Sequence, residues 1–503
     1  MSDTAIPPRR GLTPGQKAAM GGAMLSMMLA ALDQNIVNTA LPRMVGDLGG
    51  MSHLSWVVTA FMLTSTSTTP LYGRLSDMYG RRRLFLVSIS IFLAGSALCG
   101  LAQSMGELVA FRALQGIGAG GLLTLAQAAV GDVVSPRERP RYQGYFTCTF
   151  AVSSMIGPVL GGAITSLLSW RWVFYINIPV GILAVTLLMI GLTSQKAPTK
   201  NQPIDWPGAL LLTGGTGALL LALSQGGTLG WTSPLVMALA AATVILYGAF
   251  WFREQRAAAP IVSFALFRNP VFARGVIVSG MMTFAMMGST VFLPLYFQLV
   301  LGMDPAHAGM MLLPQVAGMV ITSIIGGRIV SRIGKNKPFL LAGLILESIA
   351  LGSLAVFATL GAAPGFFLIS MGLLGLGIGM GMPNLTTAVQ NATPHSQLGA
   401  ATGAMSFLRS LGGAVGVAVS GALMTDRLTA ALEKLGGTMD LSALMEKGVS
   451  ALSAFTPDQQ EAVASAYRQA LTGNFLLSAI IMSLAFILVL PLPSVTLRDK
   501  IED

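Results

Sequence analysis

The stretch Gly73–Arg83 reads GRLSDMYGRRR and lies between two long apolar runs. This placement predicts a short basic connection between two membrane helices. A second copy, GRIVSRIGKNK, occupies Gly327–Lys337 and again separates two apolar runs. Any short cytoplasmic loop collects Arg and Lys, but these copies agree in both glycines as well as in charge. The pattern therefore favours a duplicated membrane protein, the usual build of a secondary transporter.

Composition places the chain in the membrane. Of its 503 residues, 53% are hydrophobic and only 10% are charged, whereas a soluble protein carries about 25% charged residues. Cys99 and Cys148 both lie in apolar runs, so we expect no disulfide. No cleavage site follows the first long apolar run, which we therefore interpret as a permanent span.

Apolar runs separated by turn and charge signals predict about 14 transmembrane helices in an all-α polytopic membrane protein. The basic turns follow the second and tenth runs, so two additional helices are expected between two six-helix bundles. The predicted domains are an N-terminal six-helix bundle (1–192), two linker helices (193–260) and a C-terminal six-helix bundle (261–503). The predicted spans are 18–42, 54–72, 84–103, 107–133, 141–166, 172–192, 207–225, 233–252, 271–300, 308–330, 338–360, 366–391, 400–425 and 474–492.

The basic residues predict the orientation. With both termini in the cytoplasm, nearly all Arg and Lys fall on the cytoplasmic side, and the short external loops keep only Arg43 and Arg171. The net charge of +10 is therefore a topology signal, and no nucleic-acid partner is expected. Residues 426–473 form the one long external segment. Its helical spacing of apolar residues favours amphipathic surface helices, with a cap or partner-docking element as the alternative.

Four motifs together resemble one family. The basic turn resembles the signature loop of the major facilitator superfamily, and RALQGIG (Arg112–Gly118) its arginine motif. LDQNIVNTALP (Leu32–Pro42) and SSMIGPVLGG (Ser153–Gly162) are similar to motifs of the fourteen-helix drug:proton antiporter branch, the EmrB/QacA-like multidrug exporters. Asn35 and Ser153 depart from the usual threonine and glycine. The resemblance covers essentially the whole chain and implies proton-coupled export.

Two acids lie deep within apolar runs, Asp33 in the first span and Glu347 in the eleventh. An ionisable group at membrane depth is costly and is by default a functional candidate. Gln34, Asn35, Asn38 and Thr39 follow Asp33 and suggest a hydrated cavity wall. We expect a proton-linked or cation-binding role for Asp33, with a structural pairing to a buried arginine as the alternative. Glu347, in an apolar setting, either faces a cavity or makes a helix contact.

Two arginines are also expected inside the membrane, Arg112 and Arg409. Each needs an acceptor or water, because guanidinium does not deprotonate in proteins. The resemblance implies that Arg112 takes part in proton coupling near Asp33. In that mechanism, either Arg112 or a cationic drug holds the unprotonated Asp33, and protonation releases it. The alternative for each arginine is a bond to backbone carbonyls.

The resemblance also implies roles for residues of the loop and of the fifth span. In the antiporter motif, small residues and a proline would allow two helices to pack closely and still tilt against each other. Generic helix packing is the alternative. Asp77 would pair with neighbouring arginines or cap a helix, as a latch that biases alternating access. The antiporter-motif residues are Gly157, Pro158, Gly161 and Gly162. The gating-loop residues are Gly73, Arg74, Asp77, Gly80, Arg81 and Arg82.

A substrate cavity would be lined by polar, aromatic and methionine side chains. Soft methionines suit a pocket that accepts many shapes, although most of the 29 should pack or face lipid. The candidate cavity residues are Asn38, Trp56, Gln115, Phe284, Phe292, Tyr296 and Arg409.

Other functional classes find little support. The sequence has no GxxxxGK[ST] loop for an ATP-driven pump, and no HExxH or paired Cys/His set for a metal site. We therefore expect no catalytic residues, metal or cofactor. We expect a monomeric exporter of hydrophobic, cationic drugs in the cytoplasmic (inner) membrane, with protons and small molecules as partners. A proton-coupled transporter of one metabolite or lipid is the alternative, and a periplasmic adaptor stays an open question.

Overall fold

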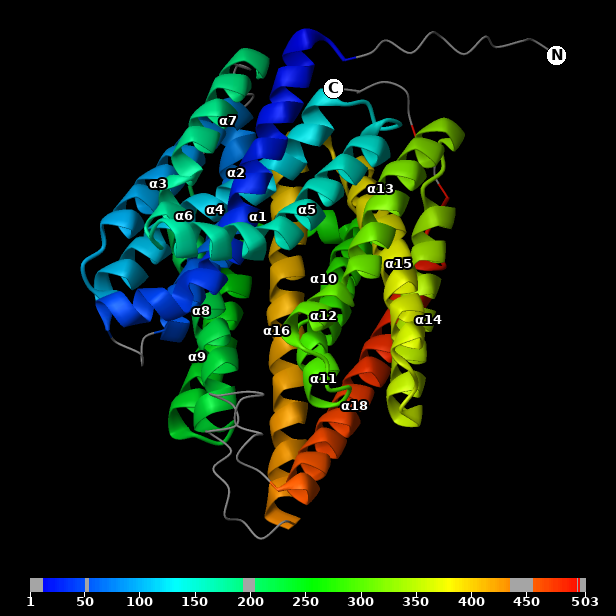
Figure 1. The fold of residues 1–503 in the computed structure, drawn as a ribbon. Coiled ribbons are helices and arrows are strands. Elements are labelled where there is room, and N and C mark those ends of the chain that lie inside the picture. Colours follow the sequence, from blue (N-terminus) through cyan, green and yellow to red (C-terminus); the bar gives the residue numbers. More distant parts are fainter. Residues whose placement is uncertain (1–11, 50–53, 193–203, 435–455, 495, 498–503) are drawn as a thin grey trace, which may run out of the picture.

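The computed structural model describes residues 12–49, 54–192, 204–434, 456–494 and 496–497. Within these ranges every regular element is a helix, and Figure 1 shows the helices packed side by side. The predicted fold class, an all-α polytopic membrane protein, is confirmed.

The helices fall into three groups along the chain. The first group, called here the N-terminal half, comprises α1 (Pro14–Leu48), α2 (Leu54–Tyr79), α3 (Arg81–Leu101), α4 (Met105–Val133), α5 (Arg139–Leu167), α6 (Trp172–Tyr175) and α7 (Asn177–Gly191). A hairpin follows, made of α8 (Trp206–Leu229) and α9 (Pro234–Glu254). After the 3₁₀ helix η2 (Phe264–Arg268), the C-terminal half comprises α10 (Pro270–Thr290), α11 (Leu293–Leu299), α12 (Pro305–Met310), α13 (Leu313–Ile333), α14 (Lys337–Leu360), α15 (Pro364–Asn391), η3 (His395–Gln397), α16 (Leu398–Lys434) and α18 (Pro457–Val489).

In the described part of the chain, 12 helical segments are long and apolar enough to cross a membrane. Helices α1 and α2 are not among them, although they pack within the same bundle. Polar residues near the middle of each helix lower its hydropathy: the Asp33–Asn35 run in α1 and the TSTSTT run at 64–69 in α2. With these two helices the bundle would have the predicted 14 spans, and that number stays a prediction.

Both copies of the basic turn contain a glycine with a positive φ angle. Gly80 (φ 91°) separates α2 from α3, and Gly334 (φ 74°) separates α13 from α14. Both lie in the left-handed region that only glycine adopts without strain, which is why the sequence repeats a glycine at this position. The start of α1 adjoins the first turn, and the Leu497 N–H donates to the Gly334 carbonyl at 2.8 Å. We call this end of the molecule the basic end.

The two halves contact each other at the basic end. Gly73 on α2 lies directly against Gly399 on α16, and Gly327 on α13 lies against Pro140 on α5. Among the described residues, every hydrogen bond that joins the N-terminal half to the C-terminal half lies in this region, including Arg139 to Asn391 at 2.6 Å. This conformation is therefore closed at the basic end.

The α8–α9 hairpin packs beside the line where α2 meets α16. Leu212 and Phe250 form a small apolar cluster with Phe407 of α16, and Leu71 of α2 packs against it. Two carboxylates fix the ends of the hairpin: Asp205 accepts from Arg253 at 2.9 Å, and Glu254 accepts from the Val262 N–H. The hairpin covers one flank of the contact between the halves. The domain boundaries at 192 and 260 stay predictions.

The predicted external loop 426–473 is wrong in part. Helix α16 continues to Lys434 and α18 begins at Pro457, so both ends of the segment are helical. Leu428 on α16 and Val463 on α18 are buried in one cluster, which explains why the helices extend. At 1.5 Å per residue, the 37 residues of α16 measure about 56 Å, well beyond a bilayer core of about 30 Å. Residues 435–455 lie outside the described ranges.

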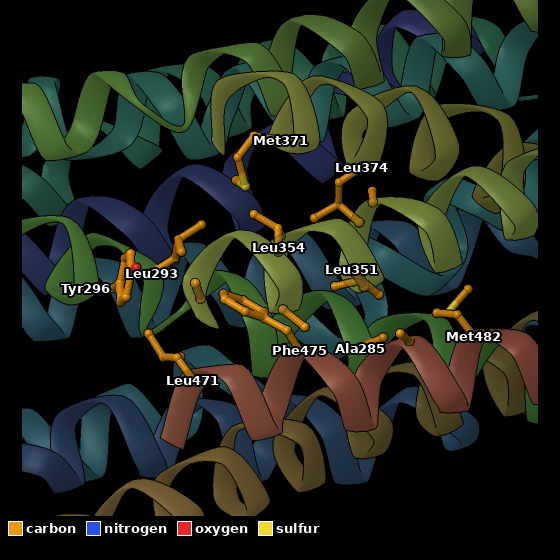
Figure 2. Close-up of a cluster of buried hydrophobic side chains, with 14 of the residues drawn as sticks. Ala285, Leu293, Tyr296, Leu351, Leu354, Met371, Leu374, Leu471, Phe475 and Met482 are labelled. Atoms are coloured by element: carbon orange, nitrogen blue, oxygen red, sulfur yellow. The ribbon is translucent and has the colours of Figure 1, made fainter. Parts of the chain in front are cut away.

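The C-terminal half has a large core between α10, α11, α14, α15 and α18. Figure 2 shows part of this core, where aliphatic and aromatic side chains of these helices lie against one another. The labelled members on α14, α15 and α18 are Leu351, Leu354, Met371, Leu374, Leu471, Phe475 and Met482. This packing ties the helices of the C-terminal half to one another.

Candidate functional site

A buried ion pair lies in the middle of the N-terminal half. Arg112 on α4 donates from Nη1 to Oδ2 of Asp33 on α1 at 2.5 Å, and both side chains are at most 1% exposed. The other carboxylate oxygen, Oδ1, accepts from Gln115 and from Asn177, each at 2.8 Å. Asp33 is thus held by three donors from two other helices.

The guanidinium of Arg112 makes further contacts. Its Nε donates to the Val57 carbonyl at 3.3 Å, and Nη1 donates to Oε1 of Gln115 at 2.7 Å. The ring of Phe61 lies 4.0 Å from the guanidinium carbon, a cation–π contact. Removing one partner of a buried pair leaves an uncompensated charge and costs about 3–5 kcal/mol. The conformation therefore depends on the charge of Asp33.

The expected location of Asp33 on a hydrated cavity wall is wrong for this conformation. Asp33 is fully buried, whereas Asn38 and Thr39 are exposed. Residues three and four positions apart share a helix face, so Asp33 lies with Ile36 and Val37, both 0% exposed. The polar neighbours in sequence lie on other faces of α1. A cationic substrate therefore has no direct access to Asp33 here.

Two residues that sequence reasoning missed complete the network. Asn177 begins α7 and donates to both Asp33 and Ser96, and Ser96 on α3 also accepts from Gln115 at 3.2 Å. A lone asparagine at the start of a strongly apolar run was the available signal for Asn177. Gln115, predicted to line the cavity, is 0% exposed and belongs to this network instead. Its spacing of three residues from Arg112 could have indicated this.

The gating loop forms a compact ion cluster at the basic end. Arg81 bridges two carboxylates, donating to Asp77 and to Asp132, each at 2.8 Å. Asp77 also accepts from the Gly399 and Ala400 N–H groups at the first turn of α16, each at 2.8 Å. A carboxylate is favourable at a helix N-terminus, where backbone donors lack partners. Asp77 thus ties the N-terminal half to the C-terminal half.

Sequence reasoning missed Asp132, and His395 beside it, because both depend on contacts between distant helices. His395 Nε2 lies 3.4 Å from Asp132 Oδ1. The other loop residues surround this cluster: Gly73 lies against α16, Gly80 makes the turn, and Arg74 and Arg82 are half-buried. In the second copy Ser331 replaces the carboxylate, and its carbonyl accepts from Arg137 at 3.1 Å. The two copies of the basic turn therefore contact the opposite half through different chemistry, a carboxylate in the first copy and a backbone carbonyl in the second.

We expect Asp77→Asn to weaken closure of the basic end. The amide removes the charge that Arg81 and the start of α16 both attract, yet it keeps the size of the side chain. Transport should fall severalfold while the thermal unfolding midpoint stays near that of wild type. Glu107→Gln, on exposed Glu107 of α4, is the matched control. Normal transport by Asp77→Asn would remove the gating role.

The antiporter-motif glycines pack α5 against α1. A Cβ at Gly157 would lie 2.6 Å from the Asn35 Cβ, and one at Gly161 would lie 2.7 Å from the Ile36 carbonyl oxygen. The other two motif residues differ from expectation, since Pro158 and Gly162 are exposed and Gly162 has no neighbour within 4 Å of such a Cβ. Gly157 and Gly161 are four residues apart and therefore lie on the same face of α5, which is the face that packs on α1.

Glu347 lies at a helix contact. It is 1% exposed on α14, and a Cβ at Gly377 of α15 would lie 2.6 Å from its Cγ. Its Oε1 has no hydrogen-bond partner among the described residues. Burying a carboxyl oxygen without a hydrogen-bond partner is costly. Glu347 therefore stays a candidate for a second protonatable site besides Asp33.

The remaining cavity candidates separate into two groups. Trp56, Phe284, Phe292 and Arg409 are half-buried, and their position beside a cavity stays a prediction. Tyr296 is wrong as a cavity residue, because it is 0% exposed and packs against Phe367 with ring centroids 5.4 Å apart. Figure 2 shows Tyr296 beside Leu293 within the core. The described residues contain no cluster of three or more His, Cys, Asp or Glu that could hold a metal ion.

Comparison with known proteins identifies the family. The profile of the Major Facilitator Superfamily matches residues 23–417. The chain belongs to the major facilitator superfamily. Members of this superfamily are membrane transporters and not enzymes, as the sequence predicted. The resemblance drawn from the four motifs is confirmed.

Several relatives that are named as transporters or efflux pumps are about one-third identical in sequence to this chain. It is 36% identical over 466 residues to "Multidrug transporter protein MdtP" of Bacillus subtilis (strain 168), covering 89% of this chain and 85% of the relative. It is 36% identical over 416 residues to "Multidrug resistance protein 3" of the same organism, covering 81% and 79%. It is 34% identical over 503 residues to "Efflux pump FUS6" of Gibberella fujikuroi, covering 95% and 89%.

Solved structures of the superfamily share the fold. The human organic anion transporter MFSD10 (TETRAN) superposes with a TM-score of 0.65 at 17% identity, covering 95% of this chain and 100% of that one. The proton:xylose symporter XylE superposes with a TM-score of 0.62 at 13% identity, covering 94% of each chain. At these identities the likeness shows the fold alone.

Proposed function

We propose that this transporter is a proton-coupled antiporter that exports hydrophobic, mainly cationic drugs and toxic compounds by alternating access. The observation that carries the proposal is the buried pair of Asp33 and Arg112, held by Gln115 and Asn177. A carboxylate inside a membrane protein is expensive and marks proton or ion pathways. Relatives named as multidrug transporters and efflux pumps support the direction and the substrate class.

In this mechanism the proton acts on the packing of α1. Protonation of Asp33 removes the charge that holds Arg112, so the contacts of α1 with α4 and α7 weaken. Helix α1 packs on Gly157 and Gly161 of α5, and the other end of α5 packs on α13 of the C-terminal half. A change at Asp33 therefore reaches the contact between the halves through one helix. The substrate and the proton use alternate conformations.

Two further residues have assigned parts. Glu347 is an auxiliary protonatable site within the C-terminal half, where its Oε1 lacks a partner among the described residues. Asp77 is the latch that favours the conformation closed at the basic end, through the N–H groups at the start of α16. Both act on the equilibrium between conformations, and neither needs contact with the substrate.

The proposed location is the cytoplasmic (inner) membrane, with the basic end and both termini in the cytoplasm and the chain acting as a monomer. The excess of Arg and Lys at the basic end supports this orientation. We expect a cysteine introduced at Ser166, exposed at the opposite end of α5, to react with a membrane-impermeant maleimide in intact cells. A cysteine at exposed Arg83 should react only after permeabilisation. The reverse pattern would overturn the orientation.

The transport proposal is tested with the purified protein in liposomes that carry a pH gradient and report uptake of a cationic dye. We expect uptake to follow the gradient and to stop when an ionophore collapses it. Competition by several unrelated cationic compounds would support a broad substrate range. Uptake that is indifferent to the pH gradient would overturn proton coupling, and transport of a single metabolite or lipid alone would favour the alternative.

A further inference from the structure

Arg409 differs from the other intramembrane arginine in its partners. It lies on α16, and its Nε donates to Ser279 of α10 at 3.2 Å while Nη2 donates to Thr386 of α15 at 3.1 Å. Both partners are neutral hydroxyls. Among the described residues no carboxylate forms an ion pair with Arg409, whereas Arg112 pairs with Asp33. The charge of Arg409 is therefore not compensated by the helices around it.

The guanidinium of Arg409 also has donors to spare. It carries five N–H groups, and the two hydroxyls take only two of them. The side chain is only partly buried. A guanidinium fork matches a carboxylate or a related anionic group with two parallel hydrogen bonds.

The position of Arg409 suits a ligand that enters from the end opposite to the basic turns. One turn toward the basic end, Met405 is buried in an apolar cluster with Val276 and Val389. One turn in the other direction, a Cβ at Gly413 would lie 3.3 Å from Met287. Arg409 thus lies between a buried apolar cluster on the side of the basic end and Met287 on the other side. The hydrogen bonds that join the halves lie on the side of the basic end.

We infer that Arg409 binds the anionic group of acidic amphiphilic substrates, so that the transporter accepts organic anions as well as cations. This inference rests on the proposed function and adds a substrate class to it. The acidic group pairs with the guanidinium between Ser279 and Thr386, and the apolar part of the substrate packs on side chains such as Met287. Ser279 and Thr386 position the guanidinium and leave its outer edge free for the substrate.

The test compares an anionic and a cationic fluorescent amphiphile of similar size in liposomes with a pH gradient. We expect wild type to transport both. Arg409→Gln should lower the ratio of anionic to cationic uptake about tenfold or more, since a hydrogen-bonded charge pair is lost. Arg409→Lys, which keeps the charge but not the fork, should recover part of the ratio. Arg256→Gln removes a charge at an exposed position and should leave the ratio unchanged.

The outcomes separate the two proposals. An unchanged ratio in Arg409→Gln, or equal loss of both dyes, would overturn the anion site. Cation transport by wild type without any anion transport would overturn the anion site and leave the proposed function standing. Uptake of neither dye in response to the gradient would overturn the proposed function itself.

Discussion

Asp33→Asn should lower proton-driven uptake of a cationic dye to about a tenth of the wild-type rate or less. A tenfold loss of rate corresponds to about 1.4 kcal/mol in activation free energy. The amide fits the same space and still accepts a hydrogen bond, but it neither takes up nor releases a proton. Arg112 then keeps its charge in a site that is at most 1% exposed. The variant should therefore lose the response to the pH gradient, and the measurement is gradient-driven uptake into liposomes.

A second measurement separates coupling from folding. Exchange of labelled for unlabelled substrate without a gradient should survive in Asp33→Asn if only coupling is lost. Asp47→Asn is a matched control on the same helix, because Asp47 is exposed and accepts from the Trp170 ring N–H. Glu347→Gln should have a milder effect than Asp33→Asn. Full gradient-driven uptake by Asp33→Asn would exclude Asp33 from coupling and direct attention to Glu347.

Gly73→Val should stop the basic end from closing. A Cβ at Gly73 would lie 3.1 Å from the Gly403 Cα and closer still to the Gly399 carbonyl, both backbone atoms that cannot rotate away. Overpacking costs about 1–3 kcal/mol, and here the cost falls on one conformation only. A difference of that size shifts the equilibrium between conformations roughly 5- to 150-fold. Transport should fall accordingly, because each cycle requires closure.

Accessibility reports the shift directly. A cysteine placed at buried Gln143, which donates to Gln390 across the contact, should react faster in Gly73→Val than in wild type. Gly162→Ala is the control, since nothing lies within 4 Å of the added Cβ. Equal labelling rates and normal transport in Gly73→Val would show that the contact between Gly73 and Gly399 does not limit closure.

The sequence predicted the features that depend on local pattern. Apolar runs of sufficient length specify membrane helices, and the repeated glycine of the basic turns was found because a left-handed residue at Gly80 and Gly334 requires it. The two intramembrane charges at Asp33 and Arg112 were found because charge is rare in such runs. Pairing of Asp33 with a buried arginine was one of the two roles expected for this acid, and the structure brings Asp33 and Arg112 to 2.5 Å.

Two kinds of feature were harder to predict: the face of a helix on which a side chain lies, and contacts with residues distant in sequence. Neighbours in sequence lie about 100° apart around a helix, so the polar residues after Asp33 indicated the wrong face of α1. Tyr296 looked like a cavity aromatic, but its face is set by packing against α15. Asn177, Asp132 and His395 carry no local signal of the helices they contact. Only the arrangement of the helices joins them to the site.

The α8–α9 hairpin makes the two flanks of the transporter unequal for a compound dissolved in the lipid. On one flank, Leu212 and Phe250 cover the line where α2 meets α16. On the other flank, where α5 meets α13, Ile325 of α13 remains exposed at 52%. We therefore expect a hydrophobic molecule that diffuses within the bilayer to find the α2–α16 contact covered by the hairpin and the α5–α13 contact uncovered. For such molecules we expect lateral entry from this flank alone.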